Sequence, residues 1–297
     1  MTVAPSRVPA LPRPAGLPEA LRVDRCLVMG VLNVTPDSFS DGGRWMDAGA
    51  AVVHGLELVA EGADLVDVGG ESTRPGAERV AAEEEQRRVL PVVRELARQG
   101  VAVSVDTMRA STAAAALEAG ACLVNDVSGG MADPQLAKVA RDARAPYVVM
   151  HWRGHSTSMQ SRAVYADVVD DVAGELQARV EAVLDLGLLP EQLVLDPGLG
   201  FAKNAAHNWQ LLAGLPALTA LGYPVLVGAS RKRFLGSLLS GDEHAPAPVA
   251  ERADATVAVT ALAAAGGAWC VRVHEARANR AAVAVAQAVR SAGQDRP

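Results

Sequence analysis

Eight short apolar segments recur along the chain, and each has the length of a β-strand. They read CLVMGVLNV, DLVDVGG, VAVSVDT, CLVNDV, PYVVMH, LVLDPG, PVLVGASR and WCVRVH. Most are followed by glycine or polar residues and then by a segment with helical periodicity. Buried strands that alternate with helices are typical of parallel α/β folds. Eight such units predict a single TIM (β/α)8 barrel, in which the chemistry lies where the strands end.

The length of the chain fits one barrel with a short extension. The chain has 297 residues, and a barrel of this class takes about 250. Residues 1–20 contain five prolines and lack the charged-then-apolar order of a signal peptide. We therefore expect a disordered tail over residues 1–20 and one barrel domain over residues 21–297.

Capping residues and periodicity set the expected ends of several elements. Asp47 precedes one helical pattern, and Asp133 precedes another that has proline in its first turn. A long amphipathic pattern predicts a helix over residues 164–186. The last two strands are expected at residues 224–228 and 268–273.

The composition narrows the class of protein. Half of the residues are hydrophobic but only 3% are aromatic, so alanine, valine and leucine must fill the core. The net charge of −6 argues against a general nucleic-acid or membrane-surface binder, and no apolar run approaches the roughly 18 residues of a membrane span. Cys26, Cys122 and Cys270 lie in expected strands without CxxC spacing, which indicates reduced core thiols in a cytoplasmic protein.

Polar residues end most of the apolar segments. These residues are Asn33, Asp67, Asp106, Asn125, His151, Asp196, Ser230 with Lys232 just beyond it, and His274. In a (β/α)8 barrel all of these strand ends meet at one face. We therefore expect a site formed by carboxylates, amides, cations and imidazoles around one barrel mouth.

Two strand-end carboxylates suggest a heterocyclic ligand. Asp106 and Asp196 end different strands, Asn125 ends a strand between them, and Lys232 follows the seventh strand. A carboxylate accepts two parallel hydrogen bonds and therefore matches a guanidine-like ring edge, such as that of a 2-amino-pyrimidinone. These residues lack the spacing of a metal site. The alternative is that each aspartate only caps the loop that follows it.

A second group of residues carries donors and positive charge. Arg272 and His274 alternate along the last strand and so point to the same side, and Arg74 and Asn33 follow earlier strands. An arginine and a histidine at the eighth strand suit a phosphate or pyrophosphate, although Arg272 could instead pair with Glu275 at the surface. No P-loop or dinucleotide fingerprint occurs, so the phosphate is expected on the substrate.

Three further features bear on the site. Only three lysines occur in the chain, and Lys203 and Lys232 both lie beside strand ends, which suggests a need for a compact cation there. Met150 and Phe201 could sandwich a flat ring, with core packing as the alternative for Met150. The loops after the first two strands are long and polar, which is typical of lids that close over a substrate.

Eight stretches resemble the dihydropteroate synthase family of the folate pathway. They read MGVLNVTPDSFSDGG, DVGGESTRPGA, SVDTMRA, VNDVSGG, MHWRG, LDPGLGFAKN, GASRKRFLG and VRVHE. They occur in order over about residues 26–275 and so cover nearly the whole expected barrel. The arginine and alanine bias and the stretch SRKRF resemble actinobacterial members.

The resemblance implies a reaction and a cofactor. Members join 6-hydroxymethyl-7,8-dihydropterin pyrophosphate to p-aminobenzoate, release 7,8-dihydropteroate and pyrophosphate, and require Mg²⁺. By this likeness the residues that hold the pterin would be Asp106, Asn125, Met150, Asp196, Phe201 and Lys232. The pyrophosphate would be held by Asn33, Arg272 and His274, with Asn33 also a magnesium contact.

The two long loops would close over the site and frame the aminobenzoate. The loop residues that the resemblance implies are Asp41, Ser72, Thr73, Arg74 and Pro75. The residues expected to act in catalysis are Asp41, Arg74, Asp106, Asp196 and Lys232. Family members often carry serine where this chain has Arg233, so Arg233 contacts the benzoate either directly or only through its backbone N–H. The resemblance also implies a homodimer and a sulfonamide target.

Two other functions stay open at this point. A pterin-dependent methyltransferase would keep Asp106, Asn125 and Asp196 but has no use for SFSDGG, STRPG and SRKRF together. A paralogue that binds pterin without condensing it would be expected to lose loop or cationic residues. No such residue is missing from this chain.

Overall fold

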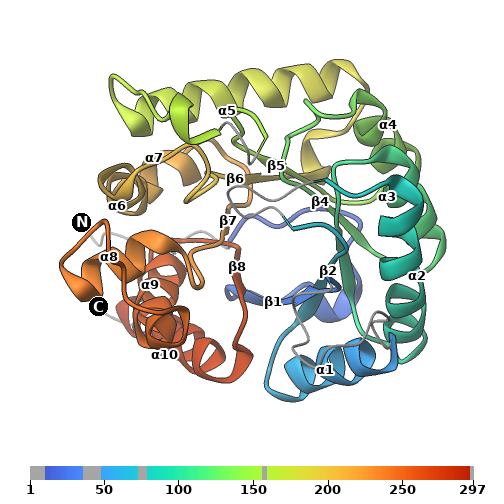
Figure 1. Ribbon diagram of the computed structural model, residues 1–297, viewed down its shortest axis with the longest axis horizontal. Coiled ribbons are helices and arrows are strands. Elements are labelled where there is room, and N and C mark those ends of the chain that lie inside the picture. The colour runs from blue at the N-terminus through green and yellow to red at the C-terminus, as the bar shows by residue number, and fades with distance from the viewer. Residues whose placement is uncertain (1–10, 36–47, 73–78, 156–158, 295–297) are drawn as a thin grey trace, which may run out of the picture.

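The computed structural model describes residues 11–35, 48–72, 79–155 and 159–294 of the chain. Within these residues, eight parallel strands surround a central axis and helices surround the strands (Figure 1). The strands are β1 (Leu27–Asn33), β2 (Leu65–Gly69), β3 (Val103–Asp106), β4 (Leu123–Asp126), β5 (Tyr147–Met150), β6 (Leu193–Asp196), β7 (Leu226–Val227) and β8 (Cys270–Val273). The expected TIM barrel is confirmed.

The sheet closes on itself. Its strands are ordered β6-β5-β4-β3-β2-β1-β8-β7, and a parallel bridge between Leu195 and Val225 joins β6 to the start of β7. Closure satisfies the backbone groups that edge strands would leave unpaired. It also brings the carboxyl end of every strand to one face of the molecule.

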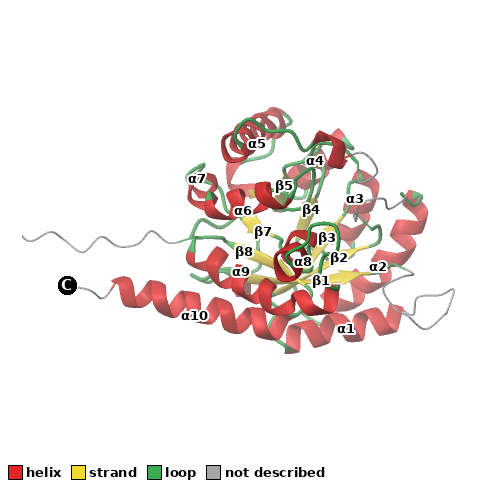
Figure 2. Cartoon of the chain, turned by 60° about the vertical axis from the view of Figure 1, so that its left-hand side comes forward, coloured by secondary structure: helices red, strands yellow, loops and turns green. Residues whose placement is uncertain are grey.

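A layer of α-helices covers the outside of the barrel (Figure 2). They are α1 (Ala48–Ala60), α2 (Ala82–Arg98), α3 (Ala110–Glu118), α4 (Pro134–Asp142), α5 (Val168–Asp185), α6 (Ala205–Ala213), α7 (Leu215–Thr219), α8 (Arg233–Ser240), α9 (Ala253–Ala265) and α10 (Ala276–Gln294). Short 3-10 turns are η1 (Glu19–Leu21), η3 (Met159–Arg162), η4 (Pro190–Gln192) and η5 (Val249–Arg252).

Alternation along the strands separates two apolar cores. One cluster fills the inside of the barrel and includes Met29, Leu65, Val148 and Val194. A larger cluster of valine, leucine and alanine residues lies between the strands and the helices. Because strand residues of opposite parity face opposite sides, apolar residues at both parities explain why the strands read as continuous hydrophobic runs.

The N-terminal segment belongs to the fold earlier than the sequence predicted. Leu17 and Leu21 are buried in the cluster inside the barrel. Gly16 has φ +86°, and a Cβ there would lie 2.5 Å from the carbonyl oxygen of Arg144. The disordered tail expected over residues 1–20 is therefore wrong for residues 11–20. Within residues 11–20, Leu11 and Leu17 are buried despite the proline-rich composition.

Some element boundaries also differ from expectation. The long helix begins at Val168 rather than at residue 164 because the Asp167 side chain accepts hydrogen bonds from Val169 N and Asp170 N. The helix α7 had no sequence-based prediction. The predicted cap at Asp133 is confirmed, since it accepts from Gln135 N and precedes proline. The predicted cap at Asp47 lies outside the described residues.

Candidate active site

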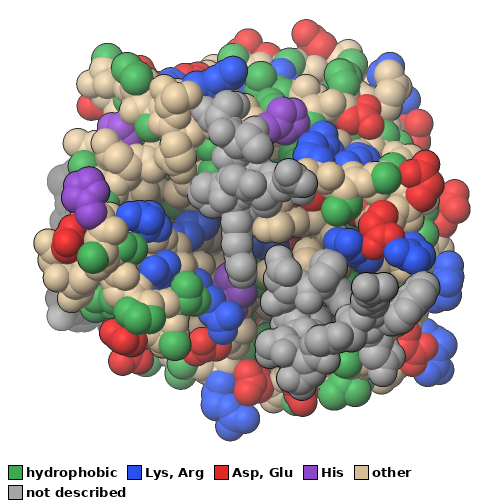
Figure 3. Space-filling model, viewed as in Figure 1, with side chains coloured by type: hydrophobic (Ala, Val, Ile, Leu, Met, Phe, Trp, Pro, Cys, Tyr) green, Lys and Arg blue, Asp and Glu red, His purple; other side chains and the backbone are tan. Residues whose placement is uncertain are grey.

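The strand-end residues expected to form a site lie at one end of the barrel. Figure 3 shows this face, where lysine and arginine side chains stand beside a hollow at its centre. The carboxyl-terminal residues Asp106 and Asp196 end β3 and β6. Arg272 lies in β8, close to its end. The structure thus brings together polar residues that are as much as 205 positions apart in the chain.

One arginine links two buried carboxylates on the β2–β3–β8 side of the mouth. Arg272 Nε donates to Asp67 Oδ2 at 2.6 Å, and Arg272 Nη2 donates to Asp106 Oδ2 at 2.7 Å. Asn125 Nδ2 donates to the same oxygen of Asp67 at 2.9 Å. The alternative pairing of Arg272 with Glu275 is not found, since Glu275 pairs with Arg231 at 3.1 Å.

Burial dominates the electrostatics of this group. It raises the pKa of Asp106 to about 7, although the Arg272 guanidinium opposes the rise. Asp67 is fully buried, and its Oδ1 has no hydrogen-bond partner among the described residues. A buried carboxylate oxygen that lacks a donor is costly. A ligand that brings N–H donors or positive charge would therefore be stabilised here.

The opposite side of the mouth carries one carboxylate and a lysine. Asp196 Oδ1 accepts a hydrogen bond from Gly198 N at 2.7 Å, and burial raises the pKa of this carboxyl against the charge of Lys232. Lys232 Nζ donates to the carbonyl oxygen of Leu199 and lies 4.8 Å from the centre of the Phe201 ring. Burial lowers the pKa of Lys232 to about 8.

An apolar wall lies between the two charged sides. Met108, Val127 and Met150 are buried together, and Trp152 and Phe201 pack against them. Met150, for which core packing was the alternative, therefore lies at the mouth in the same cluster as the Phe201 side chain. Such a wall suits the face of a flat ring. Met108 and Val127 had no sequence-based role.

The remaining predicted residues occupy the rim. His274 Nδ1 lies 3.0 Å from Ser230 Oγ. Asn33 is partly exposed at the end of β1. Arg233 begins α8, and its side chain turns to the backbone oxygen of Glu243 at 2.7 Å. Asp41, Thr73 and Arg74 lie outside the described residues.

A second polar network lies after β5 and β6 and joins the loops that follow these strands to α5. Lys203 Nζ lies 2.9 Å from His151 Nδ1, and His151 Nε2 lies 3.0 Å from Glu175 Oε2. Burial lowers the pKa of His151 to about 4 and that of Lys203 to about 7. A neutral His151 that donates from Nε2 to Glu175 leaves Nδ1 as an acceptor, so Lys203 must donate. The sequence singled out Lys203 without a role.

Three further structural features concern metal-binding groups, cysteines and membrane spans. No group of three or more histidine, cysteine or acidic residues is arranged to hold a metal ion within the described ranges. The three cysteines are free thiols. No helix in the described part of the chain is both long and apolar enough to span a membrane.

Comparison with known sequences defines the class of protein. A family model described as pterin binding enzyme matches residues 29–274, which reach from β1 to the end of β8. The barrel and its acidic mouth are thus those of a pterin-binding enzyme. The dihydropteroate synthase of Mycobacterium leprae is 55% identical over 267 residues, covering 90% of this chain and 94% of that protein. The chain belongs to the dihydropteroate synthase family.

Solved structures of dihydropteroate synthases have the same fold as this chain. The Xanthomonas albilineans dihydropteroate synthase with 4-aminobenzoic acid superimposes with a TM-score of 0.83 at 45% identity, covering 92% of this chain and 95% of that one. The same enzyme in complex with 7,8-dihydropteroate superimposes with a TM-score of 0.80 at 43% identity, again covering 92% of this chain and 95% of that one. A Yersinia pestis dihydropteroate synthase with a sulfonamide drug complex superimposes with a TM-score of 0.85 at 40% identity, covering 94% of this chain and 98% of that one.

Proposed function

We propose that the barrel mouth condenses 6-hydroxymethyl-7,8-dihydropterin pyrophosphate with p-aminobenzoate to 7,8-dihydropteroate and pyrophosphate, as befits a dihydropteroate synthase. The observation that carries this assignment is the placement of two buried carboxylates, Asp106 and Asp196, on opposite sides of one apolar wall. The chain's similarity to a synthase with 4-aminobenzoic acid and to one with 7,8-dihydropteroate supports the choice of substrates.

The pterin would lie deepest. Its amino-pyrimidinone edge presents N–H donors to Asp106 and Asp196, and the amide of Asn125 supplies one further acceptor and donor. Lys232 offers a donor for a ring oxygen or nitrogen. Met150 and Phe201 would contact the faces of the ring. In this pose the ligand satisfies carboxylates that burial leaves poorly solvated.

The pyrophosphate would lie at the rim, where the donors are. Arg272 and His274 face it from β8 and from the residue after it, and Asn33 faces it from β1. The neutral amide oxygen of Asn33 fits Mg²⁺, which commonly takes one or two protein oxygens and completes its shell with phosphates and water. Magnesium held there would neutralise charge on the departing pyrophosphate.

The reaction needs stabilisation of charge rather than a protein nucleophile. The bond between the exocyclic CH₂ and oxygen breaks, and its electrons leave with the pyrophosphate. Positive charge develops on the pterin between Asp106 and Asp196, whose fixed negative charges stabilise it. The amine nitrogen of p-aminobenzoate then forms the new bond and loses a proton. Holding the two substrates in line lowers the activation barrier further.

The second substrate would enter beside Phe201. Lys232 lies over this ring and near the start of α8. The Arg233 side chain turns away toward Glu243, which favours recognition of the benzoate carboxylate by the backbone N–H of Arg233 rather than by its guanidinium. Asp41, Thr73 and Arg74 are proposed to close over the substrates from the two long loops.

A homodimer is part of the proposal. Among the described residues, exposed large apolar side chains are concentrated on α8, η5, α9 and α10, namely Leu238, Leu239, Val249, Leu262, Val285 and Val289. Exposed apolar surface of this kind marks an interaction site. Light scattering after size-exclusion chromatography should give twice the 30.7 kDa mass of the chain. Leu262→Glu combined with Val285→Glu should shift the protein toward the monomer.

One assay separates the candidate functions. Purified protein is incubated with the pterin pyrophosphate, Mg²⁺ and p-aminobenzoate, and release of pyrophosphate is followed. A synthase releases pyrophosphate only when all three are present. A pterin-binding paralogue binds the pterin without turnover, and a methyltransferase gives no pyrophosphate. A sulfonamide that competes with p-aminobenzoate would support the assignment of the second pocket.

A further inference from the structure

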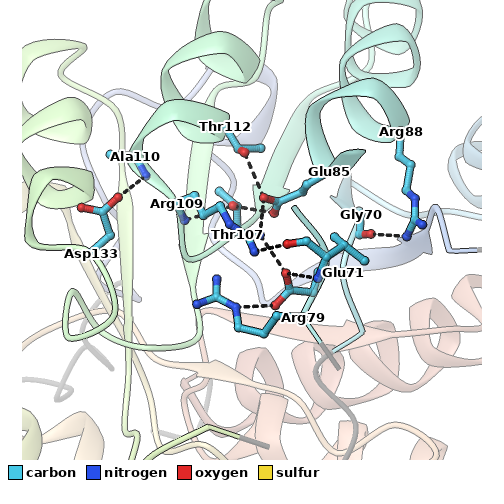
Figure 4. Close-up of polar contacts among 11 residues, drawn as sticks. Gly70, Glu71, Arg79, Glu85, Arg88, Thr107, Arg109, Ala110, Thr112 and Asp133 are labelled. Carbon is cyan, nitrogen blue, oxygen red and sulfur yellow. Dashed lines mark hydrogen bonds and ion pairs between the residues drawn. The ribbon is translucent and has the colours of Figure 1, made fainter. Parts of the chain in front are cut away.

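A buried ion-pair network joins the base of the β2–α2 loop to the β3–α3 connection, next to the mouth but outside the proposed pterin contacts. Figure 4 shows its centre, where Arg109 lies between Glu71 and Glu85. Arg109 Nη1 donates to Glu85 Oε2 and to Glu71 Oε2, each at 2.7 Å. Arg109 Nη2 donates to the backbone oxygen of Val80.

One end of this network is fixed in the core. Glu85 in α2 is 1% exposed and accepts from Thr107 Oγ1 at 2.7 Å and from Thr112 Oγ1 at 2.9 Å. Its carboxylate is therefore saturated by two hydroxyl groups and one guanidinium, as a buried charge requires. A Cβ on Gly70 would lie 2.8 Å from Val89 Cγ1, so α2 packs directly against the end of β2.

The backbone of Arg109 is also fixed. Arg109 N donates to Thr107 Oγ1 at 3.1 Å, and the next residue, Ala110, donates from its backbone N to Asp133 Oδ2 at 2.8 Å. Arg109 is the N-cap residue of α3, which begins at Ala110. The guanidinium therefore projects from a rigid support. Asp106, the proposed pterin contact, lies only three residues before Arg109 in the same stretch.

At the other end of the network, Glu71 joins the start of the β2–α2 loop to Arg79 and Val80 near its end. Glu71 directly follows Gly70, and its Oε1 accepts from Arg79 Nε at 3.0 Å. Glu71 Oε2 accepts from Val80 N at 3.3 Å as well as from Arg109. The carboxylate of Glu71, which precedes residue 72, thus binds the two residues that follow residue 78. Glu71 and Arg79 also line a pocket together with Phe201.

We propose that Arg109 is a positioning residue for the second substrate: through its bonds to Glu71 and Val80 it fixes Glu71 and Arg79, which line the pocket beside Phe201. This inference rests on the proposed function, in which p-aminobenzoate enters beside Phe201. Arg109 acts without touching substrate. An error of about 1 Å in placing a substrate-binding group can cost about 100-fold in rate, so a fixed base of the loop has a measurable effect.

The kinetic test compares variants on the two sides of Arg109. Arg109→Met removes the link, and Glu71→Gln replaces an acceptor for three N–H groups with a side chain that has only one acceptor oxygen. Both should raise KM for p-aminobenzoate about tenfold while leaving the dissociation constant of the pterin pyrophosphate within about twofold. The double variant should be no worse than the more impaired single variant, because one link is broken in each.

Thr112→Val is the matched control. It removes a hydroxyl donor from Glu85 but no contact with Glu71, Arg79 or Val80. It should lower the melting temperature without raising KM for p-aminobenzoate. An equal rise of KM in Thr112→Val would mean that general destabilisation, rather than the position of the loop, controls binding, and the proposal would be overturned.

Limited proteolysis gives a readout that needs no substrate. Trypsin cleaves after arginine but not before proline, so the Arg74–Pro75 bond resists it, whereas the Arg79–Val80 bond is a possible site. In the wild-type chain the Arg79 side chain and both backbone groups of Val80 are hydrogen-bonded within the network. Glu71→Gln should accelerate cleavage after Arg79 at least about fivefold through local opening, with no change in Thr112→Val.

The possible outcomes are distinct. If the wild-type chain releases no pyrophosphate, the proposed function fails, and the proteolysis result still judges the network. If the wild-type chain is active but Glu71→Gln keeps its KM and its resistance to trypsin, the network does not position the loop. Global unfolding of Glu71→Gln would also overturn the proposal, because Arg109 keeps Glu85 in that variant and only the loop should loosen.

Discussion

The two charged sides of the barrel mouth are built differently. On the first, called here the paired side, Asp67, Asp106 and Asn125 are tied to one another by Arg272 and by direct hydrogen bonds. On the second, called here the lysine side, Asp196 accepts a backbone N–H, while Lys203 bonds His151 and Lys232 bonds a carbonyl. No ion pair joins Asp196 to either lysine in the described part of the chain.

The paired side is held together by ion pairs, whereas the charged groups of the lysine side form no ion pair with one another among the described residues. On the paired side Arg272 forms ion pairs with both carboxylates, although burial still raises the pKa of Asp106 to about 7 and Asp67 Oδ1 has no hydrogen-bond partner among the described residues. On the lysine side burial disfavours the charged form of each group. It raises the pKa of Asp196 and lowers the pKa values of Lys203 and Lys232. Groups held in this way gain most from a ligand that supplies the missing partner. The four predictions below test this contrast, from the largest expected effect to the smallest.

Arg272→Met should have the largest effect on stability. It leaves Asp67 and Asp106 as two buried carboxylates without a cation, and breaking such a pair costs about 3–5 kcal/mol. Lys232→Met should change the free energy of unfolding by less than about 1 kcal/mol, because Asp196 keeps its bond to Gly198. Urea denaturation measures both. Equal losses in the two variants would show that the two sides do not differ.

Asp106→Asn and Asp196→Asn should each lose about 2–4 kcal/mol of transition-state stabilisation. Both carboxylates are proposed to face the positive charge that develops on the pterin. Steady-state kcat/KM should therefore fall about 30-fold to 1000-fold. Values near wild type for both variants would reject their assignment to the pterin site.

The pH dependence of stability should reveal Lys203. Its pKa is lowered from 10.5 to about 7 by burial, so between these values the unfolded chain binds more protons than the folded chain. The free energy of unfolding therefore rises with pH in this window, by at most about 1.4 kcal/mol per pH unit from this residue. Lys203→Met should lose that slope in urea titrations from pH 7.5 to 9.5. Parallel curves for both proteins would contradict the burial effect.

Arg233→Ala should have the smallest effect. The side chain is exposed and bonds only backbone oxygens of the following loop, so stability should change by less than about 0.5 kcal/mol. KM for p-aminobenzoate should stay within about twofold, since a backbone N–H survives the substitution. A tenfold rise in KM would instead show that the guanidinium holds the benzoate carboxylate.

The sequence predicted the barrel well because its signal is local. Each strand is a short apolar run followed by a polar residue, and strand order in a (β/α)8 barrel follows from the order in the chain. The predictions for Asp106, Asn125 and Asp196 depended on that geometry alone, and the structure places all three at the mouth. The prediction of a disordered tail was wrong for residues 11–20, because Leu11 and Leu17 are buried there without forming a periodic pattern.

The contacts of the site residues were less predictable. Arg272 was expected to be free for phosphate, yet it bonds Asp67 and Asp106, which are 205 and 166 positions away. Arg109, Glu71 and Glu85 had no predicted role, because arginine and glutamate near helix ends usually indicate solvated surface. The strand-end rule could have drawn attention to Glu71, which follows β2 by two residues.

The sequence by itself determined which side chains reach the barrel mouth, because the side-chain alternation of a strand and the place where it ends are local properties. Only the tertiary structure decided which charges neutralise one another. Closure of the barrel brings β8 against β1 and the loop after β3 against α2, and burial there converts ordinary acids and bases into pairs or into unpaired groups. Pairing energy depends on distance and desolvation, and neither is recorded in the order of residues.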